Sequence, residues 1–350
     1  MPENSKSEDF YENNEGTFGD NNYFDRQFAT YNKEESEKRK LKIEAFIIGV
    51  PLIIAGGISE FWSKIYFYIA ARLGFSQTAA YNFAVDSGIS QIFQIVLSCF
   101  MFIIPFALSV KIAGRSVSSR VPFKRVKKKQ ILPFFALGVA FCFFASVMVS
   151  FSGSLFESFG VNYSVDFGEN PEGFFGIALT VISTAIVPAL VEEFAFRGII
   201  LGGLLQFGDA FAIISSSLIF GIMHGNFVQM PFAFLVGLIL GYIRVKTDSL
   251  WLGILIHFFN NFTSVLNDYL VMGLSAEVIS VIYSIMICLF FALGIISIIY
   301  IAGKDDFKAF ELSSGEYKIQ EKSKYLWLFT SLPILAVLGL YIVRSFKYFL

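Results

Sequence analysis

Long apolar runs separated by short polar stretches make up most of the chain after residue 42. Nine such runs occur, each close to or above the ~20 residues with which a helix crosses a bilayer. They lie near residues 43–71, 89–113, 131–152, 174–206, 209–228, 230–246, 249–270, 277–302 and 325–346. The runs lack the alternation of strands, and a backbone in lipid must satisfy its own hydrogen bonds. The pattern predicts an all-α polytopic membrane bundle with eight or nine transmembrane helices.

The first 42 residues are polar and differ from everything that follows. Residues 1–36 carry nine acidic and three basic side chains among repeated Asn and Gly. Such a segment cannot bury enough apolar surface to order itself, so the composition predicts disorder. The expected organisation is a disordered acidic cytoplasmic tail at 1–42, a transmembrane core at 43–324, and one additional C-terminal transmembrane helix at 325–350.

Basic residues are distributed unevenly among the loops, and this distribution predicts the orientation. The loop 111–130 holds eight Lys and Arg residues and no acidic ones. The flanking loops 73–91 and 153–173 hold no Lys or Arg. Because basic loops stay on the cytoplasmic side, the N-terminus and the loop 111–130 are expected in the cytoplasm. The lipid bilayer is thus the first expected partner.

Composition excludes several classes of protein. Hydrophobic residues make up 55% of the chain, charged residues 16%, and the mean hydropathy is +0.64. A soluble domain has about a quarter charged residues, so a soluble enzyme and a nucleic-acid-binding protein are excluded. The three cysteines lie separately in apolar runs and form no disulfide or metal-binding pattern.

Six polar side chains interrupt the apolar runs in the middle of the chain. A charge at the bilayer centre costs about 2.5–3.5 kcal/mol on insertion scales, so such residues are candidates for function. The six are Glu192, Glu193, Arg197, His224, His257 and Asn261. His224 and His257 are the only two histidines in the chain. The three runs that hold these six residues would be separate helices. The side chains can therefore meet only if they lie at similar depths in the membrane.

Helix geometry predicts that the depths do agree. At 1.5 Å per residue, Glu192 lies roughly 22 Å from the cytoplasmic junction of its run, and His224 lies at a similar depth. His257 and Asn261 lie roughly 14 and 20 Å from theirs, and their i,i+4 spacing puts them on one helix face. The sequence therefore predicts one intramembrane polar site built from three helices.

Glu, His, His and Asn suit the hydrolysis of a peptide bond. A general base must activate water, and donors must stabilise the oxyanion. We expect Glu192 and His224 to activate the water, and His257 and Asn261 to bind the oxyanion. Glu193 and Arg197 are spaced i,i+4 in the favourable order, so they are expected to form a supporting ion pair. No G-x-S-x-G or H-E-x-x-H motif is present.

These residues resemble the CPBP family of intramembrane proteases, also called Abi proteins, which includes CAAX-processing and bacteriocin-processing members. The family pattern is E-E-x-x-x-R, then F-x-x-x-H, then H-x-x-x-N. Here the three motifs are Glu192-Glu193 with Arg197, Phe220 with His224, and His257 with Asn261. The resemblance covers about 174–265. It implies an all-helical core, endopeptidase activity on a membrane peptide or protein, and the residue roles just described.

Alternatives to a metal-free protease remain open at this stage. Glu192, His224 and His257 could instead hold Zn²⁺, although no cofactor is our expectation. A catalytically silent member of the family could act as a scaffold or regulator by binding another membrane protein, as bacteriocin-immunity proteins would. A transporter would use the same polar cluster as an ion relay. The composition favours the plasma membrane of a bacterium.

Overall fold

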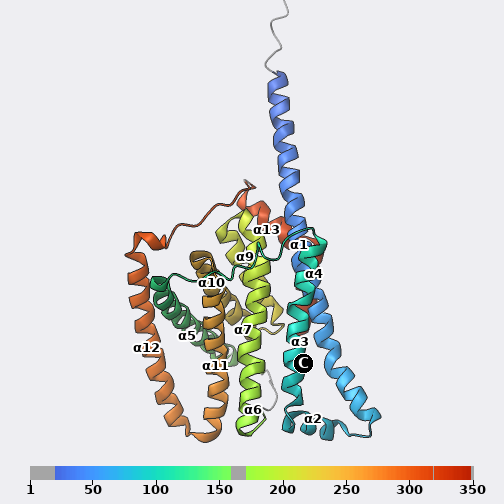
Figure 1. Ribbon diagram of the computed structural model, residues 1–350, viewed down its shortest axis with the longest axis vertical. Helices are drawn as coiled ribbons and strands as arrows, with labels where there is room; N and C mark the ends of the chain where they lie inside the picture. Colours follow the sequence, from blue (N-terminus) through green and yellow to red (C-terminus); the bar gives the residue numbers. More distant parts are fainter. Residues whose placement is uncertain (1–19, 159–170, 318, 348–350) are drawn as a thin grey trace, which may run out of the picture.

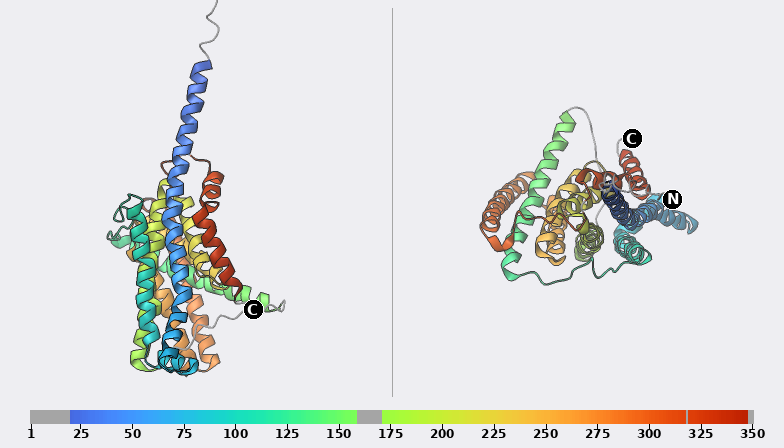
Figure 2. Two further views of the ribbon diagram at one scale, coloured as in Figure 1. Left: turned by 90° about the vertical axis from the view of Figure 1, so that its right-hand side faces the viewer. Right: turned by 90° about the horizontal axis from the view of Figure 1, so that it is seen from above.

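The computed structural model describes residues 20–158, 171–317 and 319–347. These residues are mostly helical, and none of them forms a strand. The predicted all-α class is confirmed. Together with the apolar character of the helices, it makes the chain an integral membrane protein. Figures 1 and 2 show long helices that run roughly side by side, with α1 extending beyond the others at one end.

The described helices follow one another with short connections. The first half holds α1 (Asp20–Arg72), α2 (Gln77–Asp86), α3 (Ile89–Phe102), α4 (Ile104–Ile112) and α5 (Lys128–Ser158). Next come α6 (Gly173–Thr180), the π-helix η1 (Val181–Ile186), α7 (Val187–Glu192), the π-helix η2 (Glu193–Ile200), α8 (Leu201–Leu204) and the 3₁₀ turn η3 (Leu205–Phe207). The rest is α9 (Asp209–Met223), α10 (Gln229–Thr247), α11 (Trp251–Gly273), α12 (Ala276–Ala302), η4 (Asp305–Phe307), α13 (Glu321–Phe329) and α14 (Leu332–Phe346).

The connections gather at two ends of the bundle. The basic end holds the loop 113–127, the turn 248–250 and the segment 303–320. Here Lys124 pairs with Asp248 and Lys129 pairs with Asp306 across loops that are far apart in sequence. The opposite end, called the distal end below, holds α2 and the turn between α11 and α12 (Figure 1). The basic loops therefore share one end, as the alternation of spans predicts.

Each of the nine apolar runs is helical, but the predicted number of spans is not confirmed. Among the described residues, six helical stretches are long and apolar enough to cross a membrane, or seven if α13 and α14 count as one bent span. The helix α9 is too short, with 15 residues. The helix α11 has 23 residues but is not among the six, because its His and Asn residues make it too polar.

The second half of the expected tail at 1–42 is helical in the structure. The helix α1 begins at Asp20 and continues without interruption into the bundle, whereas residues 1–19 lie outside the described residues. The charged part of this helix has partners that the sequence alone does not indicate. Lys40 donates to the hydroxyl of Tyr317 at 2.8 Å, Lys38 lies over the ring of Trp327, and Leu41 is fully buried.

Two other expected spans are interrupted. The run 209–228 stops being helical at Met223, because Gly225 adopts a left-handed φ of 62° that ends a helix. The C-terminal run is two helices, α13 and α14, bent by 66° relative to each other. The bend falls just before Pro333 at the start of α14, where the ring cannot follow a continuing helix. The predicted straight helix over 325–346 is therefore replaced by a broken one.

Aromatic packing fixes the segment that carries the glutamates. Phe196 is fully buried on η2, and its ring centroid lies 4.9 Å from that of Phe220 on α9. It also contacts Phe102 and Phe106 of the α3–α4 pair at 6.1 and 6.4 Å. Aromatic pairs at these separations are favourable beyond the area they bury. This packing holds η2 between α4 and α9, with Glu192 and Glu193 turned toward α11.

Candidate active site

The four predicted catalytic side chains line one cavity. Glu192 ends α7, His224 follows α9, and His257 and Asn261 lie one turn apart on α11. All four contribute to a cavity of about 1320 Å³. The predicted supporting residues lie behind its wall, because Glu193 and Arg197 are 0% and 1% exposed. The fold therefore brings the predicted residues together and separates the two adjacent glutamates.

The separation of the two glutamates occurs where an α-helix becomes a π-helix. The helix α7 ends at Glu192, and η2 begins at Glu193. A π-helical turn is rare and is found most often at functional sites. The Glu192 side chain keeps 15% of its surface exposed toward the cavity, whereas that of Glu193 has none. Only Glu192 can therefore reach a water molecule or a substrate in the cavity.

One carboxylate oxygen of Glu193 contacts two other side chains. Its Oε1 atom lies 2.9 Å from Nη1 of Arg197 and 3.0 Å from Nδ1 of His257. The predicted ion pair with Arg197 is present, but among the described residues neither Nη atom of Arg197 makes an aligned hydrogen bond. The guanidinium group lies over the ring of Phe220 at 4.3 Å, a favourable cation–π contact. Glu193 is thus joined to α11 as well as to its own helix.

His257 lies between the two carboxylates. Its Nδ1 atom faces Glu193, and its Nε2 atom lies 3.9 Å from Oε2 of Glu192. The contact with Glu193 does not follow from the spacing of the motifs. A signal for it exists in Gly253, one turn before His257, where an added Cβ would lie 3.0 Å from Oε2 of Glu193. A side chain at that position would obstruct the close approach of α11 to η2.

His224 owes its position to the end of α9. Its Nδ1 atom lies 2.9 Å from the carbonyl oxygen of Phe220, one turn earlier. A carbonyl oxygen only accepts hydrogen bonds, so Nδ1 carries the proton in this contact. The Nε2 atom of a neutral His224 then has a free lone pair. The Phe220 ring packs edge-on against the imidazole at 4.9 Å and limits its rotation.

Asn261 is oriented by two hydrogen bonds. Its Nδ2 donates to the carbonyl oxygen of Thr184 at 3.1 Å, and its Oδ1 accepts from Asn260 at 3.1 Å. The carbonyl of Thr184 has no α-helical donor, because Pro188, four residues later, has no N–H. One hydrogen of the Asn261 amide remains for another acceptor. No sequence pattern predicts these roles for Thr184 and Asn260.

A zinc ion at this site would need a convergent set of protein ligands. Structural and catalytic zinc sites use at least three convergent protein ligands. Among the residues that the structure describes, no group of three His, Cys, Asp or Glu side chains is placed to hold a metal ion. Glu192, His224 and His257 therefore do not fit the predicted zinc alternative as they are arranged, and no catalytic step is derived through a metal.

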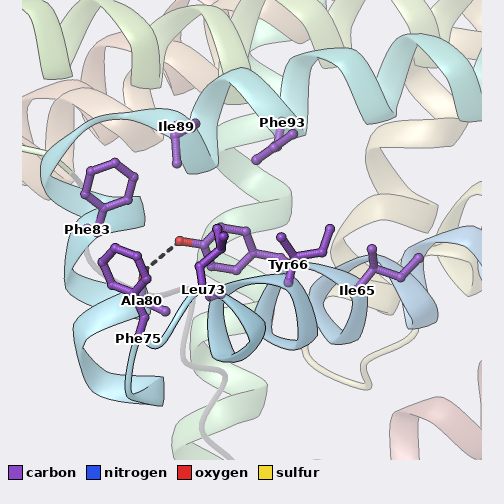
Figure 3. A pocket seen from close by; sticks show the side chains of 10 residues that line it. Ile65, Tyr66, Leu73, Phe75, Ala80, Phe83, Ile89 and Phe93 are labelled. Atoms are coloured by element: carbon purple, nitrogen blue, oxygen red, sulfur yellow. Dashed lines mark hydrogen bonds between the residues drawn. The ribbon is translucent and has the colours of Figure 1, made fainter.

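A second cavity is unrelated to this site. It has a volume of about 220 Å³ and lies where the end of α1 meets α2 and the start of α3 (Figure 3). Its lining is apolar apart from Tyr66, whose hydroxyl donates to the carbonyl of Ala80 at 2.7 Å. With no acid, base or nucleophile in its lining, this cavity offers no chemistry.

Comparisons with known proteins match the part of the chain that holds the candidate site. Residues 174–263 match the family model described as type II CAAX prenyl endopeptidase Rce1-like. A curated Bacillus subtilis (strain 168) protein, "Putative membrane peptidase YdiL", is 31% identical over 86 residues. That alignment covers 24% of this chain and 35% of the relative. No solved structure matches the chain at a significant level. The family match begins in α6 and ends in α11, so the similarity to type II CAAX prenyl endopeptidases lies in the helices that carry the candidate site.

Proposed function

We propose that this protein is an intramembrane endopeptidase that hydrolyses a peptide bond of a membrane-associated peptide or protein. One observation carries the proposal. Glu192, His224, His257 and Asn261 line a single cavity of about 1320 Å³ within the helical bundle. Small-molecule pockets are commonly about 300–1,000 Å³, so this cavity has room for a segment of polypeptide. The family match supports the same class of reaction.

Glu192 is the proposed general base. It accepts a proton from a water molecule that the Nε2 lone pair of His224 helps to position, and the water oxygen bonds to the carbonyl carbon of the substrate. Glu192 then returns the proton to the amide nitrogen. The C–N bond breaks, leaving one new carboxyl group and one new amine. A base close to the reacting water is the geometric requirement for this chemistry.

His257 and Asn261 are the proposed oxyanion donors. The Asn261 amide has one hydrogen left after its bond to Thr184. His257 donates from Nε2 if it is doubly protonated, with Nδ1–H directed at Glu193. Glu193 is then a positioning residue, and Arg197 offsets its charge.

The orientation in the membrane is part of the proposal. The basic end carries most of the Lys and Arg residues between the spans, and cytoplasmic loops hold the excess of such residues. We therefore place the basic end and the N-terminal part of α1 in the cytoplasm of a bacterial cell. The distal end then lies at the outer face of the plasma membrane.

The deciding experiment compares peptide termini in membranes of cells with the wild-type protein, with no protein, or with Glu192→Gln. An exposed carboxylate at the basic end supplies the matched control, Glu311→Gln. We expect termini that require both the protein and Glu192, and that persist with Glu311→Gln. Immunoblots should show equal amounts of each variant in the membrane. A phenotype of the deletion together with termini unchanged by Glu192→Gln would favour the catalytically silent scaffold.

A further inference from the structure

We infer that substrates enter the catalytic cavity from the distal end, so that the protease cuts polypeptide segments presented at the outer face of the membrane. This inference rests on the proposed function and adds to it the side of entry and the charge of the substrate.

Only the distal parts of the helices contribute to the lining. The helix α11 runs from the basic end to the distal end, and its lining residues begin at His257 and continue to Leu270. The helix α12 returns in the opposite direction, and its lining residues begin at Ile279 and stop at Ile287. The short helix α2, at the distal end itself, contributes Tyr81 and Val85. The cavity thus extends from the catalytic groups toward the distal end.

The path from the catalytic groups to the basic end is filled. Leu204 and Phe207 are fully buried, and Leu250 is 1% exposed. Beside them, Arg120 of the basic loop binds both carboxylate oxygens of Glu44 at 2.6 and 2.7 Å in a buried ion pair. Leu250 also donates its backbone N–H to the carbonyl oxygen of Pro122 at 3.1 Å. This hydrogen bond joins the loop 113–127 to the turn 248–250 on the basic side of the site. No residue of the loops 113–127, 248–250 or 303–317 lines the cavity.

The side of entry follows from the loop charges. The loop 111–130 contains eight basic residues, whereas the distal connection 73–91 contains none. By the rule that basic loops stay in the cytoplasm, the open end of the cavity faces outward. A polypeptide that is anchored in the membrane and extends from its outer surface can reach Glu192 along this path. A cytoplasmic C-terminal tail would meet the packed basic end.

The charge of the cavity lining further restricts the class of substrate. Glu192 and Asp268 are acidic, many other lining residues are Ser, Thr, Asn or Gln, and the described lining contains no Lys or Arg. A free carboxylate or an acidic segment would find no cation to pair with and two carboxylates to repel it. The preferred substrate is therefore a neutral or basic segment, and the cleaved bond lies at a distance from the C-terminal carboxylate of the polypeptide.

Thiol labelling in intact cells tests the side of entry. Cys99, Cys142 and Cys288 are first replaced by Ala. Single cysteines are then introduced at Asn267 in the cavity and at Lys124 on the basic end, where the Lys124 side chain is 68% exposed. We expect a membrane-impermeant maleimide to label Asn267→Cys in intact cells, and Lys124→Cys only after permeabilisation. The reverse pattern would overturn the inference and leave the proposed protease activity standing.

The peptide termini provide the second readout. Labelling of Asn267→Cys with a bulky impermeant maleimide should abolish the Glu192-dependent termini, whereas the same treatment of Lys124→Cys should leave them unchanged. The cut sites should lie in outer-face segments and be flanked by Lys or Arg more often than by Asp or Glu. Termini that persist after complete labelling, or cut sites in acidic cytoplasmic tails, would overturn the inference. If Glu192→Gln leaves every terminus in place, the proposed function fails as well.

Discussion

Glu192 and Glu193 are neighbours in sequence with opposite surroundings. Glu192 faces the cavity, and Glu193 is buried against Arg197 and His257. A carboxylate that faces the cavity can exchange protons with water and substrate, whereas a buried carboxylate enclosed by Arg197 and His257 cannot. The chemical difference between these two residues is therefore a matter of position.

Replacement of Glu192 by Gln should remove activity without unfolding the protein. General acid–base catalysis contributes about 10²–10⁴-fold, so we expect kcat to fall by about that factor. The variant keeps the size of the side chain and leaves the contacts of Glu193 with Arg197 and His257 in place. The check is turnover of an identified substrate by purified protein, together with its thermal unfolding in detergent. Activity within a factor of two of wild type would contradict the assignment of the base.

Replacement of Asn261 by Ala should mainly lower kcat. Removing one oxyanion donor costs about 10²–10³-fold in kcat, and the substrate ground state depends less on that donor. Asn260→Ala is the matched control, because Asn260 contacts the Oδ1 atom of Asn261 and not its amide nitrogen. We expect a smaller loss for this control. Steady-state kinetics of both variants decide the point, and a change confined to KM would argue against an oxyanion role.

The approach of α11 to η2 depends on a missing side chain. Gly253 faces Glu193 at a distance that leaves no room for a methyl group without a shift of several tenths of an ångström. Because His257 lies one turn further on the same face, a shift of α11 would move its imidazole away from both carboxylates. The geometry of the site thus depends on how closely these two helices pack.

Gly253→Ala should therefore lower activity with little effect on folding. Misplacement of a catalytic group by about 1 Å can cost 10²-fold, and a smaller shift should give a loss of about 10-fold. Gly339→Ala on α14 is the control, because an added Cβ there meets nothing within 4 Å. The measurement is kcat/KM for both variants at equal membrane levels. Equal activity of the two would show that α11 tolerates the methyl group.

The buried pair of Arg120 and Glu44 connects distant parts of the molecule. Glu44 lies on α1, Arg120 lies in the basic loop, and Gln206 near the end of the glutamate-bearing segment donates to Glu44 at 3.3 Å. The pair is packed so closely against Gly203 that an added Cβ would collide with both side chains. It therefore holds α1 to the part of the fold that carries the site.

Arg120→Ala should destabilise the whole molecule. Removal of one partner of a buried ion pair leaves the other charge uncompensated and costs about 3–5 kcal/mol. Lys124→Ala breaks the exposed pair with Asp248, where the expected loss is about 0–1 kcal/mol. The stability of both variants is measured by denaturant unfolding in detergent and by the level of protein in membranes. Equal stability of the two variants would mean that the buried pair contributes nothing.

Periodicity and charge determined much of this protein from the sequence alone. The apolar runs determined the all-α membrane class, and the basic loops determined which connections share one end. The residues for the candidate site were identified because charged and polar groups are rare in lipid. The sequence did not reveal the end of α9 at Met223, the bend between α13 and α14, or the helix over residues 20–42. Each of these depends on contacts or on local backbone geometry that hydrophobicity does not record.

The tertiary structure decided how the candidate residues are used. Glu193 and His257 are 64 positions apart, and their contact depends on the packing of α11 against η2. The periodicity of one helix gives the relative directions of its own side chains but not its rotation and depth against a neighbour. Those are set by close contacts such as Gly253 against Glu193 and Phe196 against Phe220. For the same reason, the set of residues that lines the cavity became apparent only once all the helices were packed together.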